Sequence, residues 1–587
     1  MKLENNSEQS EGMYSYKSEK EDNYNNNKNH QNEINNNNVD NNFPPAFESD
    51  AIRRSNPNIN EEITQKQKFE SNFYQSGMLK GNLQSNGTIP LRVSQASIEI
   101  PQDSILHWSF VLVYLILEIL VIIIIATTFE WDKRNHPKYS CINNNNNNIN
   151  PDNLTIDDSI DNKTILDELY SETENELSIY SGLFRDINIM AFVGFGMLHT
   201  LTKGNSWASI GFNILSIALS FQISLFFNLL FENAFNEEWN QGILNFDTFI
   251  KALFNSCAIL VSFGGIHGKI SHIQYLVLII SETILCSLNF KLCDVKMKII
   301  DTGGGLYIHT FGGIFGLAIY IVLFRSRKKR QNLGNYIISS LTNNLSNITC
   351  FIGVLFIINY FPSLNGGLAL TEHGRYRAVI NTYFSLIGSI ALSFITSGFF
   401  HKEKFNFEEI LFGSFSGGVI VSCYSAVCLD HWAALLIGML YGFICVILFE
   451  YLKKLFNNIG FYDIYNIIIV HAIPGILSAF ISSMFIAGLK HRNVDFHNIE
   501  FKDINRKSHS QAAIQIGAIF VTLALSFVGG ITVGFLIKVA RCGKIRNFFD
   551  DNEIFHYEIN GDNFNDNATN YADNNQPSFM NEPSNIK

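Results

Sequence analysis

Charged residues are scarce in this chain: Lys, Arg, Asp and Glu together make up 16% of 587 residues. The scarcity is concentrated in the middle, where apolar segments follow one another from Ile105 to about Val539. Such a region is too apolar for a water-soluble domain, so it predicts a membrane domain. Residues 1–100, rich in Asn, and residues 543–587 lack the apolar surface that offsets chain entropy, so we expect both to be disordered tails.

Several chemical signatures are also missing. The nine cysteines are scattered without a C-x2-C pair, so neither a disulfide framework nor a cysteine metal site is expected. No basic cluster with interleaved aromatic residues indicates a nucleic-acid partner. The absence of a phosphate-binding glycine loop, a nucleophile elbow and a metal-ligand cluster argues against an enzyme, a cofactor and a bound metal. No cleavable signal peptide precedes the first apolar stretch, which we expect to act as a signal anchor.

The middle of the chain, residues 101–542, contains apolar stretches of the length that crosses a bilayer, about 20 residues. We therefore predict an all-α polytopic membrane protein with about twelve membrane-spanning helices. The predicted spans lie near 106–128, 188–202, 208–231, 248–267, 271–292, 304–324, 335–360, 378–400, 408–428, 432–452, 466–487 and 512–538.

The basic residues give an orientation to these spans. An even number of spans places both termini on one side, and the basic run Arg325–Arg330 marks that side as cytoplasmic by the positive-inside rule. The segment 130–187, which carries two glycosylation sequons at Asn153 and Asn162, is then an exoplasmic loop. The loop 489–507 also carries five basic residues and counts against this assignment.

Two segments share one pattern: Asp301–His309 opens the sixth predicted span, and Asp463–His471 opens the eleventh. Along a helix this spacing places each His about 12 Å from its Asp. Because five spans separate their starts, the two segments enter from opposite faces and the histidines converge. The pattern predicts an inverted repeat, spans two to six mirrored by spans seven to eleven, with a site at the midplane.

Each residue of this pattern has a structural and a functional interpretation. A single intramembrane histidine usually makes a helix–helix hydrogen bond, but a matched pair favours a function because buried ionisable groups are costly. Imidazole donates and accepts protons near neutrality, so we predict that His309 and His471 line a conduction path. We expect Asp301 and Asp463 mainly to cap and position the helices that present these histidines. Pro474-Gly475 predicts a kinked or broken helix.

These segments resemble the Rh branch of the ammonium transporter and Rhesus glycoprotein superfamily. Asp301-Thr-Gly-Gly-Gly-Leu-Tyr-Ile-His-Thr-Phe-Gly-Gly-Ile-Phe-Gly-Leu317 is similar to the Rh signature D-A-G-G-S-M-x-I-H-x-F-G-A-Y-F-G-L, and His471-Ala-Ile-Pro-Gly475 to H-G-x-P-G. Further matches follow in family order between 180 and 540: Phe192-Val-Gly-Phe-Gly-Met-Leu198, Ile380-Asn-Thr-Tyr383, Gly417-Gly-Val419 and Gly529-Gly-Ile-Thr-Val-Gly534.

The resemblance implies a plasma-membrane homotrimer in which each protomer conducts ammonia or ammonium, and also methylammonium, through its own hydrophobic pore. It implies that His309 and His471 are twin pore histidines and that Asp301 and Asp463 are the paired aspartates. Phe254 matches the first of two gate phenylalanines. Leu364 occupies the position of the second, and a leucine offers no π face to a cation.

A second departure concerns the outer vestibule. Phe290 stands where many Rh proteins carry an acidic residue, which weakens electrostatic concentration of ammonium unless Glu372 or the exoplasmic loop compensates. Two rival functions stay open, a non-conducting membrane scaffold or sensor and a CO2 channel. Glu118, Glu282 and Glu450 lie in apolar spans; they suggest a proton relay less strongly than helix-end or interhelical contacts.

Overall fold

In the computed structural model, the described residues are 102–131, 179–202, 204–326, 329–334, 344–402, 404–427, 429–488, 502, 506–539, 548–551 and 555. Several predictions lie outside them: the tail 1–100, most of the tail 543–587, most of the loop 130–187 with its sequons, and most of the loop 489–507.

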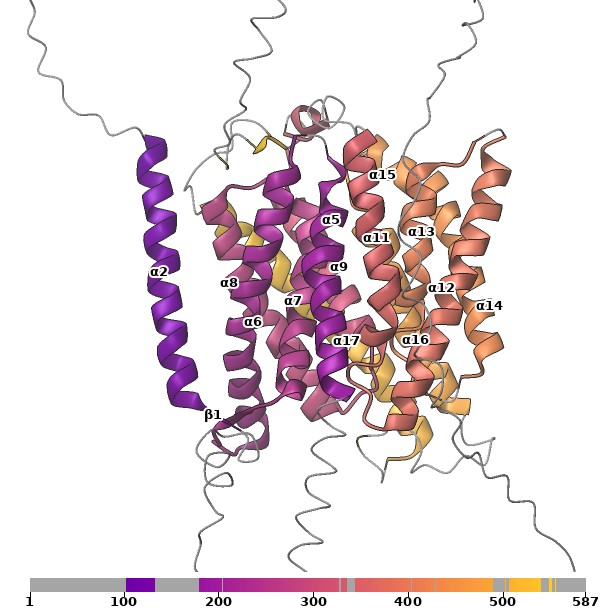
Figure 1. Cartoon of the computed structure of the whole chain (residues 1–587), viewed down its shortest axis with the longest axis horizontal. Helices are drawn as coiled ribbons and strands as arrows, with labels where there is room; N and C mark the ends of the chain where they lie inside the picture. The colour runs from indigo at the N-terminus through magenta and orange to yellow at the C-terminus, as the bar shows by residue number, and fades with distance from the viewer. Residues whose placement is uncertain are drawn as a thin grey trace, which may run out of the picture. The chain divides into compact units, whose positions relative to one another are not determined.

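The described chain is helical almost throughout, which confirms the predicted all-α polytopic fold (Figure 1). Its long α-helices include residues 179–189 and the labelled helices α2 (Gln102–Thr128), α6 (Ser206–Asn236), α7 (Phe246–Ile266), α8 (His272–Lys291), α9 (Phe311–Leu323), α11 (Asn344–Asn365), α12 (Glu372–Phe400), α13 (Phe407–Ile420), α14 (His431–Leu448), α16 (Ile473–Gly488) and α17 (Ser508–Val539). Shorter elements interrupt or extend them: η4 (Met190–Phe195), α5 (Gly196–Leu198), η5 (His199–Leu201), η6 (Leu292–Met297), η7 (Gly305–Thr310), η8 (Phe449–Lys453), α15 (Lys454–Asn458) and η9 (Ile468–Ala472). Two short strands, β1 (Phe129–Trp131) and β2 (Gly242–Leu244), pair in parallel.

Among the described residues, ten helices are long and apolar enough to cross a membrane. The two other predicted spans are also helical: the chain from 179 to 201, which the π-helical turn η4 interrupts, and α13, which has only 14 residues. The predicted ninth span, 408–428, is too long, because the helix ends at Ile420 and turns follow it. The seventh is described from Asn344 onward, as α11; its predicted start near 335 falls in residues 335–343, which lie outside the described part.

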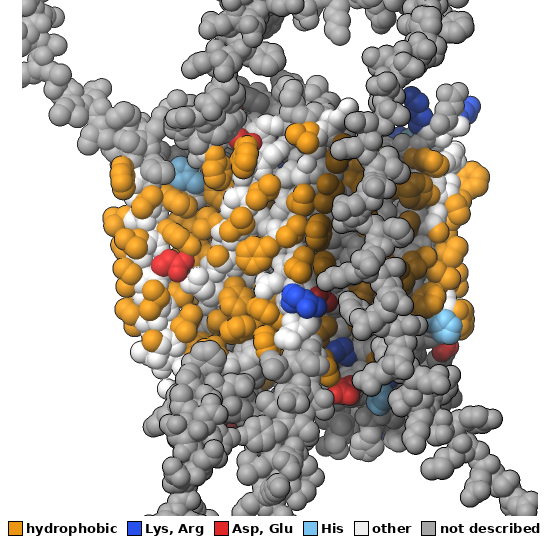
Figure 2. All heavy atoms as spheres, viewed as in Figure 1, with side chains coloured by type: hydrophobic (Ala, Val, Ile, Leu, Met, Phe, Trp, Pro, Cys, Tyr) orange, Lys and Arg blue, Asp and Glu red, His pale blue; other side chains and the backbone are white. Residues whose placement is uncertain are grey.

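Hydrophobic side chains are spread over the described surface on the side drawn in Figure 2, with few charged groups among them. The outermost helix, α2, is the extreme case: Leu112 is 58% exposed and Ile122 is 65% exposed. Apolar side chains exposed in this number suit a surface that faces lipid.

The helix bundle has two opposite ends, which we call the tail face and the vestibule face. The tail face is where residues 548–551 contact the bundle: the Phe549 amide donates to the Gly268 carbonyl, and the Asp551 amide donates to the Gly204 carbonyl. The vestibule face lies at the other end of α6, around Glu232, where two cavities open. Residues 548–551 fall in the predicted C-terminal tail, and they lie against the bundle because the Asp551 carboxylate accepts the first free amides of α6.

Candidate functional site

The two predicted aspartates each hold the start of a helix. Asp301 is 3% exposed, and its carboxylate accepts three backbone N–H groups, from Gly305 (2.6 Å), Leu306 (2.9 Å) and Tyr307 (3.0 Å). A carboxylate in this position satisfies amides that have no partner within the helix and complements the helix dipole.

Asp463 does the same in the second half of the chain. Its carboxylate accepts the amides of Ile467 (3.0 Å) and Ile468 (3.1 Å), four and five residues further on. The residues five positions before each histidine, Gly304 (φ 76°) and Asn466 (φ 54°), both adopt the left-handed conformation. The two segments thus share a backbone bend as well as an aspartate.

The structure brings His309 and His471 together. Their Nδ1 atoms lie 3.0 Å apart, and their rings stack with centroids 5.1 Å apart and an interplanar angle of 16°. Both are buried, at 1% and 3% exposed. Each lies in a π-helical turn, η7 or η9, a rare feature that often marks functional sites. The predicted break near Pro474 is therefore a π-helical turn that begins before His471.

The packing around the histidines is reciprocal. Gly313 lies four residues after His309, and a Cβ there would stand 2.8 Å from the side chain of Ala472. Gly475 lies four residues after His471, and a Cβ there would stand 2.6 Å from the Thr310 hydroxyl. Each glycine therefore contacts the residue next to the other histidine, as an inverted repeat requires.

Aromatic rings extend the histidine pair at both ends. Phe361 of α11 stacks on His309 with centroids 5.7 Å apart, and Phe195 of η4 lies 6.4 Å from His471. These phenylalanines come from the first helix of each repeat, and the sequence analysis did not single them out. Together the four rings form a column through the buried centre of the bundle.

The two predicted gate residues, Phe254 of α7 and Leu364 of α11, are both buried and both adjoin Gly367. A Cβ on Gly367 would stand 3.0 Å from the Phe254 ring and 3.1 Å from the Leu364 carbonyl oxygen. Gly367 also lines one of the two cavities at the vestibule face. Both residues thus adjoin a glycine that lines that cavity.

The vestibule face has two adjoining cavities of about 360 and 400 Å³, which share Glu232, Asp247 and Lys251 among their lining residues. Each of three carboxylates there has a lysine partner. The pairs are Lys251–Asp247 at 2.6 Å, Lys291–Glu232 at 2.5 Å and Lys502–Asp294. In the sequence, Phe290 stands where an acidic residue was expected, and Glu372 or the exoplasmic loop was the expected substitute. All three pairs were missed; in two of them the partners come from different elements.

Two further buried histidines, His199 and His267, lie between the column and the tail face; we call them the inner histidine pair. The His199 ring lies 6.0 Å from Phe195, at the end of the column, and 6.0 Å from the His267 ring. Its Nδ1 has no hydrogen-bond partner among the described residues. Sequence reasoning missed both residues, since each is a lone histidine without a repeated motif.

His267 is fully engaged in hydrogen bonds. Its Nε2 lies 2.6 Å from the Asn205 amide nitrogen and 2.7 Å from the Ser209 hydroxyl, and its Nδ1 lies 3.1 Å from the Tyr275 hydroxyl. Because an amide nitrogen only donates, the Nε2 accepts and the Nδ1 carries the proton. This tautomer fixes the orientation of the ring.

Beside this network, in the turn between α7 and α8, lies the buried Lys269. Its ammonium group donates to the carbonyls of Gly265 (2.7 Å) and Tyr462 (3.4 Å). Burial lowers the pKa of Lys269 to about 8, and the nearby charge of Asp463 opposes that shift. A cationic group is thus held at the edge of the tail face.

Comparisons with known proteins agree with this geometry. The sequence profile described as Ammonium Transporter Family matches residues 163–546. Rhesus-like glycoprotein A of Dictyostelium discoideum is 30% identical over 397 residues, covering 65% of this chain and 74% of that protein. Ammonium transporter Rh type B of Oryzias latipes is 30% identical over 410 residues, covering 67% and 85%.

Among solved structures, Nitrosomonas europaea Rh50, a member of the Rhesus protein family of channels, is similar in fold. Its TM-score is 0.55 at 21% sequence identity, and the match covers 68% of this chain and 98% of that one.

Proposed function

Because the chain belongs to the ammonium transporter family and has Rh-type relatives, we propose that it conducts ammonia, delivered as ammonium, past His309 and His471. Methylammonium would enter in the same way and pass as methylamine. The observation that carries the proposal is the 3.0 Å contact between the Nδ1 atoms of two buried histidines on opposed π-helical turns. A structural histidine pair needs no such symmetry.

The contact constrains the chemistry of the pair. Of the two Nδ1 atoms one must donate and the other accept, so in the neutral pair one Nε2 is a bare acceptor and the other carries a proton. The Nε2 of His309 has no partner among the described residues. Ammonia both donates and accepts hydrogen bonds, so the pair suits it, whereas CO2 only accepts.

The vestibule face would collect the substrate as ammonium. Glu232, Asp247 and Asp294 attract a cation there, and their lysine partners limit how tightly it is held. Below them, Phe254 and Leu364 close the path to water. An ammonium ion would lose its hydration at this point, so it transfers its proton to the water of the vestibule and continues as ammonia.

Beyond the column, the path would continue to the inner histidine pair. The partnerless Nδ1 of His199 offers a hydrogen bond after Phe195, and His267 leads on to the Asn205 and Tyr275 network near the tail face. On this proposal the tail face and both termini are cytoplasmic, the membrane domain is residues 101–542, and the protein is a homotrimer in the plasma membrane. Cross-linking of the purified protein tests the trimer.

The test uses the full-length protein in liposomes that contain a pH-sensitive dye. An inward gradient of ammonia should alkalinise the lumen faster than in protein-free liposomes, because each arriving molecule takes up a proton. Changing both His309 and His471 to Ala should alter the rate or the selectivity for methylammonium. His431→Ala is the matched control, since His431 is exposed at the start of α14.

The outcomes separate the rival functions. A CO2 channel would acidify the lumen under a CO2 gradient and leave the ammonia response at the protein-free rate. A scaffold or sensor would change neither. An imposed inside-negative potential accelerates entry of ammonium ions but leaves entry of ammonia unchanged. Ammonia rates equal with and without protein would refute the proposal.

A further inference from the structure

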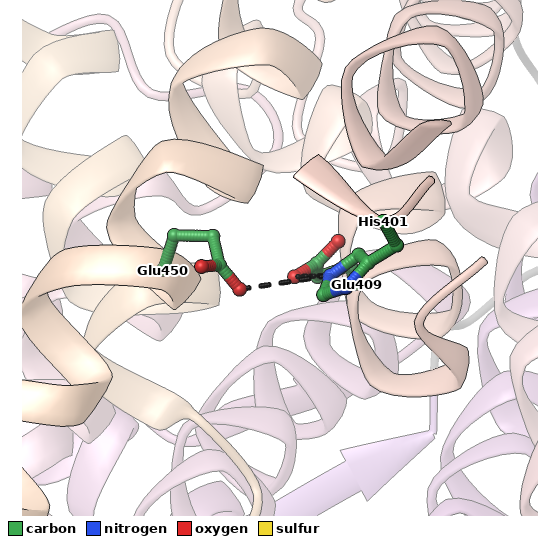
Figure 3. A group of neighbouring side chains, drawn as sticks. All are labelled: His401, Glu409 and Glu450. Carbon is green, nitrogen blue, oxygen red and sulfur yellow. Dashed lines mark hydrogen bonds and ion pairs between the residues drawn. The ribbon is translucent and has the colours of Figure 1, made fainter. Parts of the chain in front are cut away.

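Three ligand-type side chains that are not part of the histidine column lie together: His401, Glu409 and Glu450 (Figure 3). His401 follows the end of α12, Glu409 lies in the first turn of α13, and Glu450 lies in the π-helical turn η8 that continues α14. One ligand atom from each lies within 4.8 Å of the other two. Nothing in the conduction path uses these residues.

The separations suit a shared metal ion. The Nε2 of His401 lies 3.1 Å from one oxygen of Glu409 and 3.6 Å from one oxygen of Glu450. Two ligands bound at about 2.0–2.1 Å in tetrahedral geometry lie about 3.3 Å apart. The observed distances lie on either side of that value.

Glu409 gives a second observation. It is 1% exposed, and its other carboxylate oxygen has no hydrogen-bond partner among the described residues. A buried carboxylate with an unsatisfied oxygen is costly, and a second carboxylate beside it adds repulsion. A cation between the two would remove both costs.

Neighbouring groups hold the ligands in place and leave one side open. The Lys454 ammonium donates at 2.5 Å to the oxygen of Glu450 that faces away from His401. The Asn406 side chain caps α13 by accepting the Glu409 amide at 3.4 Å and the neighbouring amide at 3.0 Å. Outer contacts of this kind orient metal ligands. His401 is the most exposed of the three, at 32%, so a water molecule can complete the coordination.

We infer that His401, Glu409 and Glu450 bind one divalent transition-metal ion of the Zn²⁺ class. One imidazole and two carboxylates match the donors that Zn²⁺ accepts, and they balance its charge. The ion would join the end of α12, the start of α13 and the continuation of α14. Because Phe415 of α13 lies 5.8 Å from His471, the ion would also stiffen a helix that borders the histidine column.

The test is titration of metal-free, full-length protein in detergent with Zn²⁺ by calorimetry, with Mg²⁺ in parallel. We expect one Zn²⁺ per chain, a higher thermal unfolding midpoint with Zn²⁺ than with Mg²⁺, and binding at least about tenfold weaker in His401→Asn and Glu409→Gln. Glu408→Gln and His431→Asn are matched controls of the same residue types outside the cluster.

His401→Asn decides the matter if Glu409→Gln does not fold, because His401 is partly exposed. Equal Zn²⁺ binding by the wild type and His401→Asn would overturn the inference. Absence of Zn²⁺ binding in the wild type would also overturn it.

Discussion

The aspartates at the two helix starts allow a quantitative test, because they differ by one hydrogen bond. Asp301→Ala leaves three buried N–H groups without an acceptor, and Asp463→Ala leaves two. At about 1–3 kcal/mol for each unsatisfied buried group, the losses are about 3–9 and 2–6 kcal/mol. Asp301→Ala should therefore be the more damaging by about 1–3 kcal/mol.

The assay is equilibrium unfolding of the full-length protein in mixed detergent and SDS micelles, followed by circular dichroism. Asp247→Ala serves as the control: Asp247 also lies in the first turn of a helix, but its partner Lys251 and its own 44% exposure make it a surface pair. That variant should lose at most about 1 kcal/mol. If Asp301→Ala were no less stable than Asp463→Ala, or if both matched the control, the aspartates would not hold these helices.

Three further perturbations test other parts of the structure. Gly475→Ala should lower the unfolding midpoint markedly, because its Cβ would meet a backbone oxygen at 2.6 Å, whereas Gly517→Ala, whose nearest neighbour is 3.7 Å away, should not. Burial lowers the pKa of Lys269 to about 8, so as the pH rises the folded protein loses this proton before the unfolded chain does. The free energy of unfolding should therefore rise by about 2–3 kcal/mol between pH 8 and pH 10. In unfolding experiments, Lys269→Met should abolish this rise. Lys291→Met removes the cationic partner of Glu232 at the vestibule face, so Glu232 should attract methylammonium more strongly. The half-saturating concentration for methylammonium uptake should then fall about two- to fivefold. An unchanged value would show that this ion pair lies off the substrate's route.

The helices and the repeat could be predicted from the sequence because both depend on local patterns of residues. Apolar stretches mark the spans, and the spacing from Asp301 to His309 recurs from Asp463 to His471. The end of α13 could not be read in the same way, since the residues after Ile420 remain apolar while the backbone turns. The π-helical turns were equally hidden, because one extra residue per turn hardly alters an all-apolar stretch.

The contacts that were missed join residues far apart in the chain. Glu232 and Lys291 are separated by 59 positions, and no pattern in the sequence around either residue predicts that the two form an ion pair. Glu450 was noticed as a carboxylate in an apolar span, but its partner His401 lies on a different helix. Such pairs follow from how helices pack, which one sequence taken alone does not reveal.

The reciprocal glycine contacts imply that neither half of the chain is a complete folding unit. Gly313 packs against Ala472 of the second half, and Gly475 packs against Thr310 of the first half. Each half taken alone would therefore leave these packing surfaces uncovered. If the chain is divided within residues 335–343, neither half should fold stably when it is produced alone. The two halves should form the folded protein when they are expressed together. The protein is in this sense an internal heterodimer, assembled from two unequal copies that share one chain.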